Sequence, residues 1–529
     1  MQPNQVVERL TKRLRTHGAV PIELAVAVIV AAVLRVYRIG DESIWLDEAV
    51  SIGVARDESW WFLLFEFPGM DPHPPLHYLL TKAWIGVFGA SEFSVRLQSA
   101  LLGVATVPVL YYLGIRLFDR FTAATASIFF AVAPFQVWYG QEARMYALFV
   151  FLTVASFLAL VHLTERYTTR RVAVYVVVAA LLAYTHVYAL FILFVQGVFV
   201  VWRWFRASDP GEAPLSLSFD EWLRTYVALG AAISPWLLLM LVRLTESTGR
   251  IAWISEPEPA VFRRIFTLFS FGYTSDAMYY HPSPPTLLLI VAAGCVVLAL
   301  GLLVPGTSLR PSTETAGWGL LGRSSKHERA AIQLLTLWLV VPIALAYSLS
   351  HLVTPFLILR PMTAISPAFL LLMAVGARAL ASVSIPYRSA VPYAVAVILI
   401  SGMLVPLPAF YDTDHKEQWR DAATFIDRTA EPGDVVLISH PYNDRPFFYY
   451  FENDDVKVIG VWPDDDLTEL DESLDDASQV YVVLRGVWGE DRQRLLDQTD
   501  AAIDGNHFGA EHRQYVGVDV YRFILMEDD

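Results

Sequence analysis

Long runs of apolar residues alternate with short polar segments over the first 410 residues of the chain. A helix of about 20 apolar residues is long enough to cross the hydrocarbon core of a bilayer. Most runs are near that length, and the pattern predicts about eleven membrane-spanning helices. We expect these helices at 19–38, 94–115, 121–139, 145–163, 172–186, 187–202, 223–243, 285–304, 330–350, 361–377 and 389–410.

The pattern changes after residue 410, where short apolar runs alternate with amphipathic segments. It predicts helices at 416–429 and 491–496, and strands at 434–439, 456–461, 480–484 and 515–525. This alternation is typical of a small α/β domain with a largely parallel sheet. The chain is therefore expected to consist of an N-terminal tail (1–18), a membrane domain (19–410) and a soluble domain (411–529).

Composition supports a membrane location. Of the 529 residues, 55% are hydrophobic and 17% are charged, which is less charge than soluble domains carry. The first apolar run is long for a signal peptide and lacks a small-residue cleavage site, so we expect it to remain as an anchor. The single cysteine, Cys295, lies in a predicted span, which excludes an internal disulfide and a cysteine-based metal site.

Charge is divided unevenly between the two domains. Residues 411–529 contain 29 Asp and Glu against 10 Lys and Arg, a net charge of −19, whereas the rest of the chain has a net charge of +5. An acidic surface argues against nucleic acid as a partner. Such acidity with few lysines resembles that of haloarchaeal proteins, and an ordinary acidic exterior domain is the alternative interpretation.

Loop charges predict the orientation in the cell membrane. Cytoplasmic loops of membrane proteins are enriched in Lys and Arg. The basic residues that fall on one predicted side are Arg9, Lys12, Arg13, Arg15, Arg116, Arg120, Arg166, Arg170, Arg171, Arg203, Arg206, Arg310, Arg323, Lys326, Arg329, Arg378 and Arg388. The N-terminus is therefore expected in the cytoplasm and residues 411–529 outside. A long external loop at 39–93 is expected to contain interfacial helices.

Two polar clusters in this external loop could support chemistry. Trp45-Leu46-Asp47-Glu48 supplies carboxylates that could act as a general base or orient a hydroxyl group. Asp71-Pro72-His73-Pro74-Pro75 combines an acid and an imidazole with prolines that end any helix. His73 could lie near a phosphate or a metal. The alternative interpretations are a capped or solvated helix start for the first cluster and a loop turn for the second.

Three further segments place polar residues on the same predicted face. Arg144 follows Gln141-Glu142-Ala143, His186 lies within Tyr184-Thr185-His186-Val187-Tyr188, and Arg360 precedes Pro361. Arginine can bind phosphate oxygens bidentately. The alternatives are a snorkelling arginine, an ion pair with Glu142 and a structural histidine. Because these residues come from separate segments yet share one face, we expect them to converge on one external cavity.

The order of these motifs resembles that of the GT-C superfamily of glycosyltransferases. More narrowly, it is similar to the protein O-mannosyltransferase and aminoarabinose-transferase branch, over about residues 20–380. The most specific pieces are Trp-Leu-Asp-Glu-Ala at residues 45–49 and His-Pro-Pro-Leu at residues 73–76. Trp-Arg-Asp-Ala-Ala at residues 419–423 also resembles the start of the exterior domain of many members.

The resemblance implies an inverting transfer of a sugar from a polyprenyl (dolichyl) phosphate to a hydroxyl group on a glycan, lipid or protein. It implies that Asp47 is the base and Glu48 its partner. The donor and its phosphate would be bound by Asp71, His73, Arg144, Tyr146, His186, Tyr188 and Arg360. The chain departs from the pattern at His73, where some relatives carry Lys, and at Pro361, where Tyr is more usual.

No obligatory cofactor is expected, because arginines and His73 could supply the positive charge. A divalent metal bound by the carboxylates with His73 and His186 is the alternative. An oligosaccharyltransferase would carry a Trp-Trp-Asp motif in its exterior domain, which residues 411–529 lack. A lipid flippase or transporter would favour mid-span ionisable groups and repeat symmetry. A membrane-anchored binding protein would leave the clusters in loop 39–93 unexplained.

Overall fold

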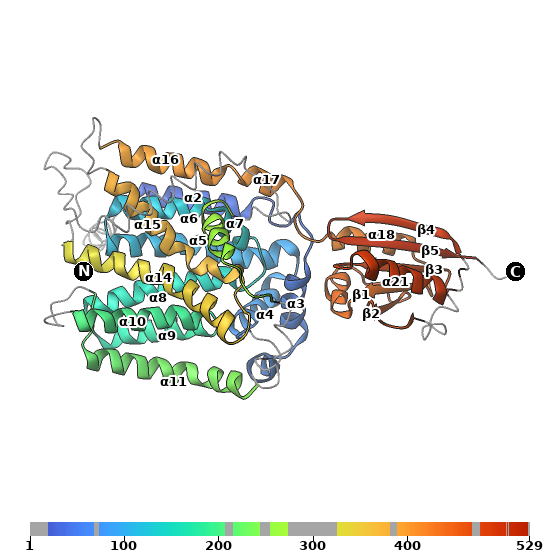
Figure 1. The fold of residues 1–529 in the computed structure, drawn as a ribbon, viewed down its shortest axis with the longest axis horizontal. Helices are drawn as coiled ribbons and strands as arrows, with labels where there is room; N and C mark the ends of the chain where they lie inside the picture. Colours follow the sequence, from blue (N-terminus) through green and yellow to red (C-terminus); the bar gives the residue numbers. More distant parts are fainter. Residues whose placement is uncertain are drawn as a thin grey trace, which may run out of the picture.

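A bundle of long helices carries a small α/β domain at one end (Figure 1). This computed structural model describes residues 20–67, 73–206, 215–243, 254–272, 325–380, 389–467, 477–503, 505 and 507–526. The predicted N-terminal tail and the predicted span at 285–304, with Cys295, lie outside the described residues.

The bundle is built from helices that match the apolar runs of the sequence. Their bounds are Ile22–Val36 (α2), Leu46–Asp57 (α3), Phe62–Glu66 (η1), Leu76–Phe88 (α4), Glu92–Leu117 (α5), Arg120–Val132 (α6), Pro134–Gly140 (α7), Tyr146–Glu165 (α8), Thr169–Ala183 (α9), Ala189–Arg206 (α10), Phe219–Arg243 (α11), Ala260–Phe271 (α12), Ser325–Leu352 (α14), Arg360–Ala364 (η5), Ser366–Ala379 (α15), Val391–Leu404 (α16) and Leu407–Asp412 (α17).

Every predicted span within the described residues falls on one or two of these helices. Five helices of the described part are long and apolar enough to cross a membrane, and a sixth span results if α6 and α7 are counted as one bent helix. The chain is therefore a multi-pass membrane protein. The shorter α10 and α15 are also apolar, and α3, η1 and α4 are the helices expected within loop 39–93.

The bend between α6 and α7 follows from one proline. The two helices meet at 58°, and Pro134 has no N–H to donate to the carbonyl oxygen of Phe130. The guanidinium of buried Arg35 replaces the missing donor, at 3.1 Å from the oxygen of Phe130 and 3.0 Å from that of Ala131. Gly140 leaves room for Arg35, because a Cβ there would lie 2.9 Å from its side chain. The bend directs α7 toward the segment 141–145.

The C-terminal domain is a three-layer α/β unit. It contains α18 (Trp419–Thr429), β1 (Val435–Ser439), η7 (Pro441–Asn443), α19 (Asp444–Phe448), β2 (Lys457–Val461), β3 (Gln479–Leu484), α21 (Gly489–Ala502), β4 (His507–Tyr515) and β5 (Val518–Leu525). The strand order is β2-β1-β3-β5-β4. Separate hydrophobic clusters bury α18 against one face of the sheet and α21 against the other.

The sheet is mixed, which corrects the expectation of a largely parallel one. β1 is parallel to β2 and β3, but β5 is antiparallel to both β3 and β4. β4 was not predicted, because most of its residues are exposed and give no alternating apolar pattern. The predicted strand 515–525 is instead the second arm of a hairpin, whose turn includes Gly517 at φ 71°.

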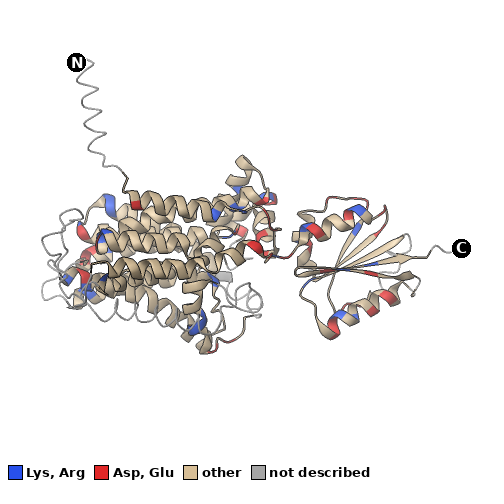
Figure 2. Cartoon of the chain, turned by 90° about the horizontal axis from the view of Figure 1, so that it is seen from above, with Lys and Arg blue, Asp and Glu red and all other residues tan. Residues whose placement is uncertain are grey.

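The arrangement brings the polar segments of the membrane domain to one end of the bundle. Charged residues gather at the two ends of the bundle and are sparse between them (Figure 2). The end that faces the C-terminal domain carries α3 and α4 (Figure 1). The α7–α8 connection and the segment before η5 approach α3 there, through contacts of Arg144 and Arg360.

Candidate active site

Asp47 lies in the first turn of α3, beside two arginines from distant segments. Its carboxylate forms an ion pair with Arg360, and its carbonyl oxygen accepts a hydrogen bond of 3.0 Å from Arg144. Arg144 also donates to the hydroxyl of Ser51, 2.7 Å away. Burial alone would raise the pKa of Asp47, but the positive charges of Arg144 and Arg360 outweigh burial and lower it.

Arg360 is held from two sides. It is the first residue of η5, and its guanidinium carbon lies 4.8 Å from the ring centre of Trp45, a cation–π arrangement. The side chains of Arg360 and Asp47 are 35% and 29% exposed, so this pair remains accessible. The carboxylate and the Arg360 guanidinium therefore meet at an accessible point beside the buried Arg144, and an anion could compete there for Arg360.

Glu48, the next residue, has a different environment. Its side chain is fully buried, and its oxygens accept bonds from Arg96 at 2.9 and 2.7 Å and from the amide of Ala143 at 2.8 Å. Lys416, from the segment that leads into the C-terminal domain, lies 3.2 Å from both oxygens. Burial would raise the pKa of Glu48, but Arg96 and Lys416 lower it. These contacts occupy both oxygens and hold the local backbone together.

The imidazole and phenol rings of four predicted site residues form a cluster around His186. The ring centre of His186 lies 5.7 Å from that of His73, 5.9 Å from that of Tyr146 and 5.5 Å from that of Tyr188. The Nδ1 atom of His186 accepts a hydrogen bond of 3.1 Å from the amide of Tyr188, so Nε2 carries the proton. This Nε2 is buried and has no hydrogen-bond partner among the described residues. It is a donor that a bound ligand could use.

The structure thus brings together Asp47, Arg144 and Arg360, and separately His73, Tyr146, His186 and Tyr188. Charge effects connect the two groups, because His73 also lowers the pKa of Asp47. The remaining predicted residue, Asp71, lies outside the described residues. Within the described ranges, no three His, Cys, Asp or Glu side chains are grouped so as to hold a metal ion.

Sequence reasoning missed several residues of the site. Arg96 lies within a predicted span, and a charge inside an apolar segment was a usable signal. Lys416 gave no such signal, because it begins an ordinary amphipathic pattern.

Glu142 and Arg144, which could have paired in the alternative interpretation of this segment, each contact other groups. Glu142 accepts a hydrogen bond of 2.6 Å from the indole of Trp138. Arg144 donates to Asp47 and Ser51. Burial raises the pKa of Glu142 to about 7. A second titratable carboxyl group therefore lies close to the arginines.

Comparisons with known proteins agree with this architecture. The family model described as dolichyl-phosphate-mannose-protein mannosyltransferase matches residues 72–238. That segment contains His73, Arg144, Tyr146, His186 and Tyr188, whereas Asp47 and Arg360 lie outside it. No curated protein matches the sequence significantly.

Solved structures match over most of the chain. Apo ArnT from Cupriavidus metallidurans has a TM-score of 0.59 at 13% identity, and the match covers 95% of this chain and 97% of ArnT. ArnT bound to undecaprenyl phosphate matches with a TM-score of 0.51 at 13% identity and the same coverage. The oligosaccharyltransferase AglB from Archaeoglobus fulgidus, in complex with an inhibitory peptide and a dolichol-phosphate, has a TM-score of 0.50 at 11% identity, covering 94% of this chain and 73% of AglB. At these identities, the likeness establishes the fold.

Proposed function

We propose, from the GT-C glycosyltransferase fold of this chain, that it transfers a sugar from a polyprenyl phosphate to a hydroxyl group of a glycan, lipid or protein at the outer membrane face. The observation that carries the proposal is the accessible Asp47 carboxylate beside Arg144 and Arg360. A lipid phosphate is an anion that two guanidinium groups can bind. ArnT binds undecaprenyl phosphate and AglB binds a dolichol-phosphate in their solved complexes, which supports a lipid-phosphate donor.

The proposed reaction is a single displacement with inversion. The acceptor oxygen attacks the anomeric carbon, the bond from that carbon to the phosphate oxygen breaks, and Asp47 takes the acceptor's proton. The polyprenyl phosphate leaves as an anion that Arg144 and Arg360 stabilise. Preorganised charge of this kind contributes about 3–4 kcal/mol per donor. In this proposal the Nε2–H of His186 donates to an oxygen of the donor, and Tyr146 and Tyr188, whose rings lie beside that of His186, contact the donor as well.

Binding of the donor would also activate Asp47. Without the donor, Arg360 lowers the pKa of Asp47 and makes it a weak base. A phosphate that draws Arg360 away and adds negative charge would raise the pKa of Asp47 toward and above its ordinary value. The carboxylate would then accept a proton more readily when the donor is in place.

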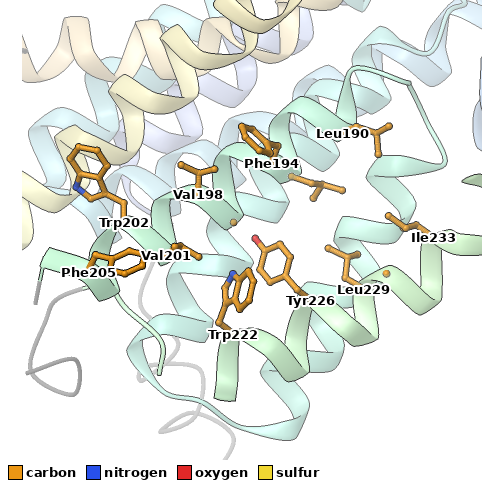
Figure 3. Close-up of a pocket in the computed structure, with 13 residues that line it drawn as sticks. Leu190, Phe194, Val198, Val201, Trp202, Phe205, Trp222, Tyr226, Leu229 and Ile233 are labelled. Atoms are coloured by element: carbon orange, nitrogen blue, oxygen red, sulfur yellow. The ribbon is translucent and has the colours of Figure 1, made fainter. Parts of the chain in front are cut away.

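An apolar groove of the membrane domain suits the prenyl chain. It lies between α10 and α11, has a volume of about 580 Å³, and is lined by Leu190, Phe194, Val201, Trp202, Trp222 and Ile233 among others (Figure 3). Leu190, which lines the groove, follows Tyr188 of the proposed donor site by two residues in the chain. From Leu190 to Phe205 the helix rises about 22 Å, at 1.5 Å per residue.

The proposal is tested with purified protein in lipid nanodiscs and labelled polyprenyl-phosphate sugars. We expect release of polyprenyl phosphate coupled to glycosylation of an added acceptor extract. The substitution Gly230→Leu would fill the groove, because a Cβ there meets nothing within 4 Å. It should weaken binding of long-chain donors more than that of short-chain analogues. Movement of lipid-linked sugar across a sealed vesicle without any transfer would instead indicate a flippase.

A further inference from the structure

We propose that Lys416 is a positioning residue of the active site, and that docking of the C-terminal domain therefore completes this site. The inference rests on the proposed function. Lys416 precedes α18, and its side chain reaches into the membrane domain. Its Nζ lies 3.2 Å from each oxygen of Glu48 and 3.4 Å from the carbonyl oxygen of Gln141. The side chain is almost fully buried there, at 7% exposure.

The contacts of Glu48 show which backbone segments a cation from the C-terminal domain holds together. Arg96 also binds Glu48, and its other donors bind the carbonyl oxygens of Ile39, Glu42 and Ser43 at 2.7–3.1 Å. Arg96 therefore fixes the segment that leads into α3. Among the described residues, its hydrogen-bond partners are Glu48, Ile39, Glu42 and Ser43, and none of these lies in the segment 141–145. The amide of Ala143 joins that segment to Glu48 by one hydrogen bond of 2.8 Å. Lys416 reinforces this connection, because it binds Glu48 and Gln141 at once.

These two backbone segments hold the proposed catalytic groups. Glu48 is adjacent to Asp47 in the first turn of α3, and Gln141 begins the segment that carries Arg144. Lys416 therefore bridges the two supports on which the distance between Asp47 and Arg144 depends. A displacement of about 1 Å in a catalytic constellation can lower the rate about hundredfold. Loss of the bridge should thus lower turnover even though Lys416 lies behind Glu48.

Other contacts attach the C-terminal domain and provide a matched control. Arg420 binds Glu92 at 2.7 Å, and the hydroxyl of Tyr450 lies 3.1 Å from the same carboxylate and accepts a bond of 2.6 Å from the amide of Ile44. These contacts involve groups other than Glu48 and the segment 141–145. Arg420 also donates to the carbonyl oxygens of Gly40, Asp41 and Glu42 before α3. A variant at Arg420 therefore weakens attachment of the domain but leaves the contacts of Glu48 and of the segment 141–145 in place.

The test compares Lys416→Met, Lys416→Arg and Arg420→Met in the full chain in nanodiscs. For Lys416→Met we expect kcat to fall about 10–100-fold, with the donor KM within about threefold of the wild-type value. Lys416→Arg should recover part of this loss, and Arg420→Met should keep kcat within about threefold of wild type. Amide hydrogen exchange of residues 46–51 and 141–145 should accelerate in Lys416→Met and stay unchanged in Arg420→Met.

Several results would overturn the inference. One is wild-type turnover in Lys416→Met, and another is an equal loss in Arg420→Met. Loss of polyprenyl-phosphate binding in Lys416→Met would also contradict it, because the role would then be general folding. A wild-type protein that transfers no sugar would refute the proposed function instead. If no transfer is found, amide hydrogen exchange still tests the inference. Unchanged exchange of residues 46–51 and 141–145 in Lys416→Met would show that Lys416 does not connect these two segments.

Discussion

At the scale of single residues, two adjacent acids have unlike environments. Consecutive helical residues point about 100° apart, since a turn contains 3.6 residues. Asp47 therefore pairs with the accessible Arg360, while Glu48 points into a buried site formed by Arg96 and Lys416. The sequence identifies both as candidate catalytic acids. Only their surroundings separate a proposed base from a group that holds the backbone in place.

Substitution of these acids should have opposite effects on rate and stability. Asp47→Asn should reduce kcat by about a hundredfold or more, with little change in the unfolding midpoint in detergent. Glu48→Gln should destabilise the protein by about 3–5 kcal/mol, because it leaves Arg96 and Lys416 buried without a carboxylate. Activity assays and thermal unfolding measure the two effects. Near-normal transfer by Asp47→Asn would rule it out as the base.

Substitution of the arginines should affect the leaving group. Arg144→Ala and Arg360→Ala should each weaken polyprenyl-phosphate binding about 10–100-fold, since a charged hydrogen bond contributes about 1.5–3 kcal/mol. Lysine at either position should restore only part of the affinity, because an ammonium cannot form the bidentate contact. Direct binding of labelled polyprenyl phosphate measures this. Unchanged affinity in both alanine variants would count against the phosphate site.

Glu142 should make stability depend on pH near neutrality. Burial raises its pKa from 4.5 to about 7, although Lys416 and Arg360 partly oppose this. A raised pKa in the folded state means that stability is fully present below about pH 4.5 and is lost as pH rises through about 7. The unfolding midpoint should therefore fall between about pH 5 and 8. Glu142→Gln should flatten this dependence, and an identical pH profile in the variant would refute the assignment.

At the scale of elements, apolar runs predict helices well, because a membrane span must bury a continuous apolar surface. Strand β4, which the sequence pattern does not predict, lacks such a signal. β4 is polar and exposed on most of its residues. The site was predictable only in part: Arg144, His186 and Arg360 stand out as polar residues between spans. Lys416 was not predictable, because its partner Glu48 lies 368 positions away in sequence.

The bend between α6 and α7 leads to a test of helix energetics. Arg35→Met should lower stability by about 1–3 kcal/mol for each carbonyl left without a donor. Adding Pro134→Ala supplies an N–H to the carbonyl oxygen of Phe130. The double variant should therefore recover part of the lost stability in thermal unfolding. If Pro134→Ala lowers stability equally in both backgrounds, Arg35 does not substitute for the missing amide.

At the scale of the whole molecule, the proposed site and the basic helix ends lie at opposite ends of the helix bundle. The proposed site and the acidic C-terminal domain share one end of the bundle, whereas Arg116, Arg166 and Arg378 lie at the C-terminal ends of α5, α8 and α15, at the other end. The loop charges predict that the acidic end is outside the cell. A reporter fused after residue 410 should be active only outside, and protease should remove residues 411–529 from intact cells. A cytoplasmic C-terminal domain would refute the mechanism.

The ion pair between Asp47 and Arg360 has a consequence for the order of events during turnover. In the proposed enzyme, the arginine that binds the phosphate also pairs with the catalytic base, so the base is inactive when no donor is bound. On the proposed mechanism, Asp47 cannot deprotonate water or another hydroxyl group until a lipid phosphate has displaced Arg360. Substrate addition should therefore be compulsory-ordered, with the donor first and the acceptor second. Dead-end analogues of the acceptor should then inhibit uncompetitively against the donor, the kinetic pattern of an enzyme that is switched on by its first substrate.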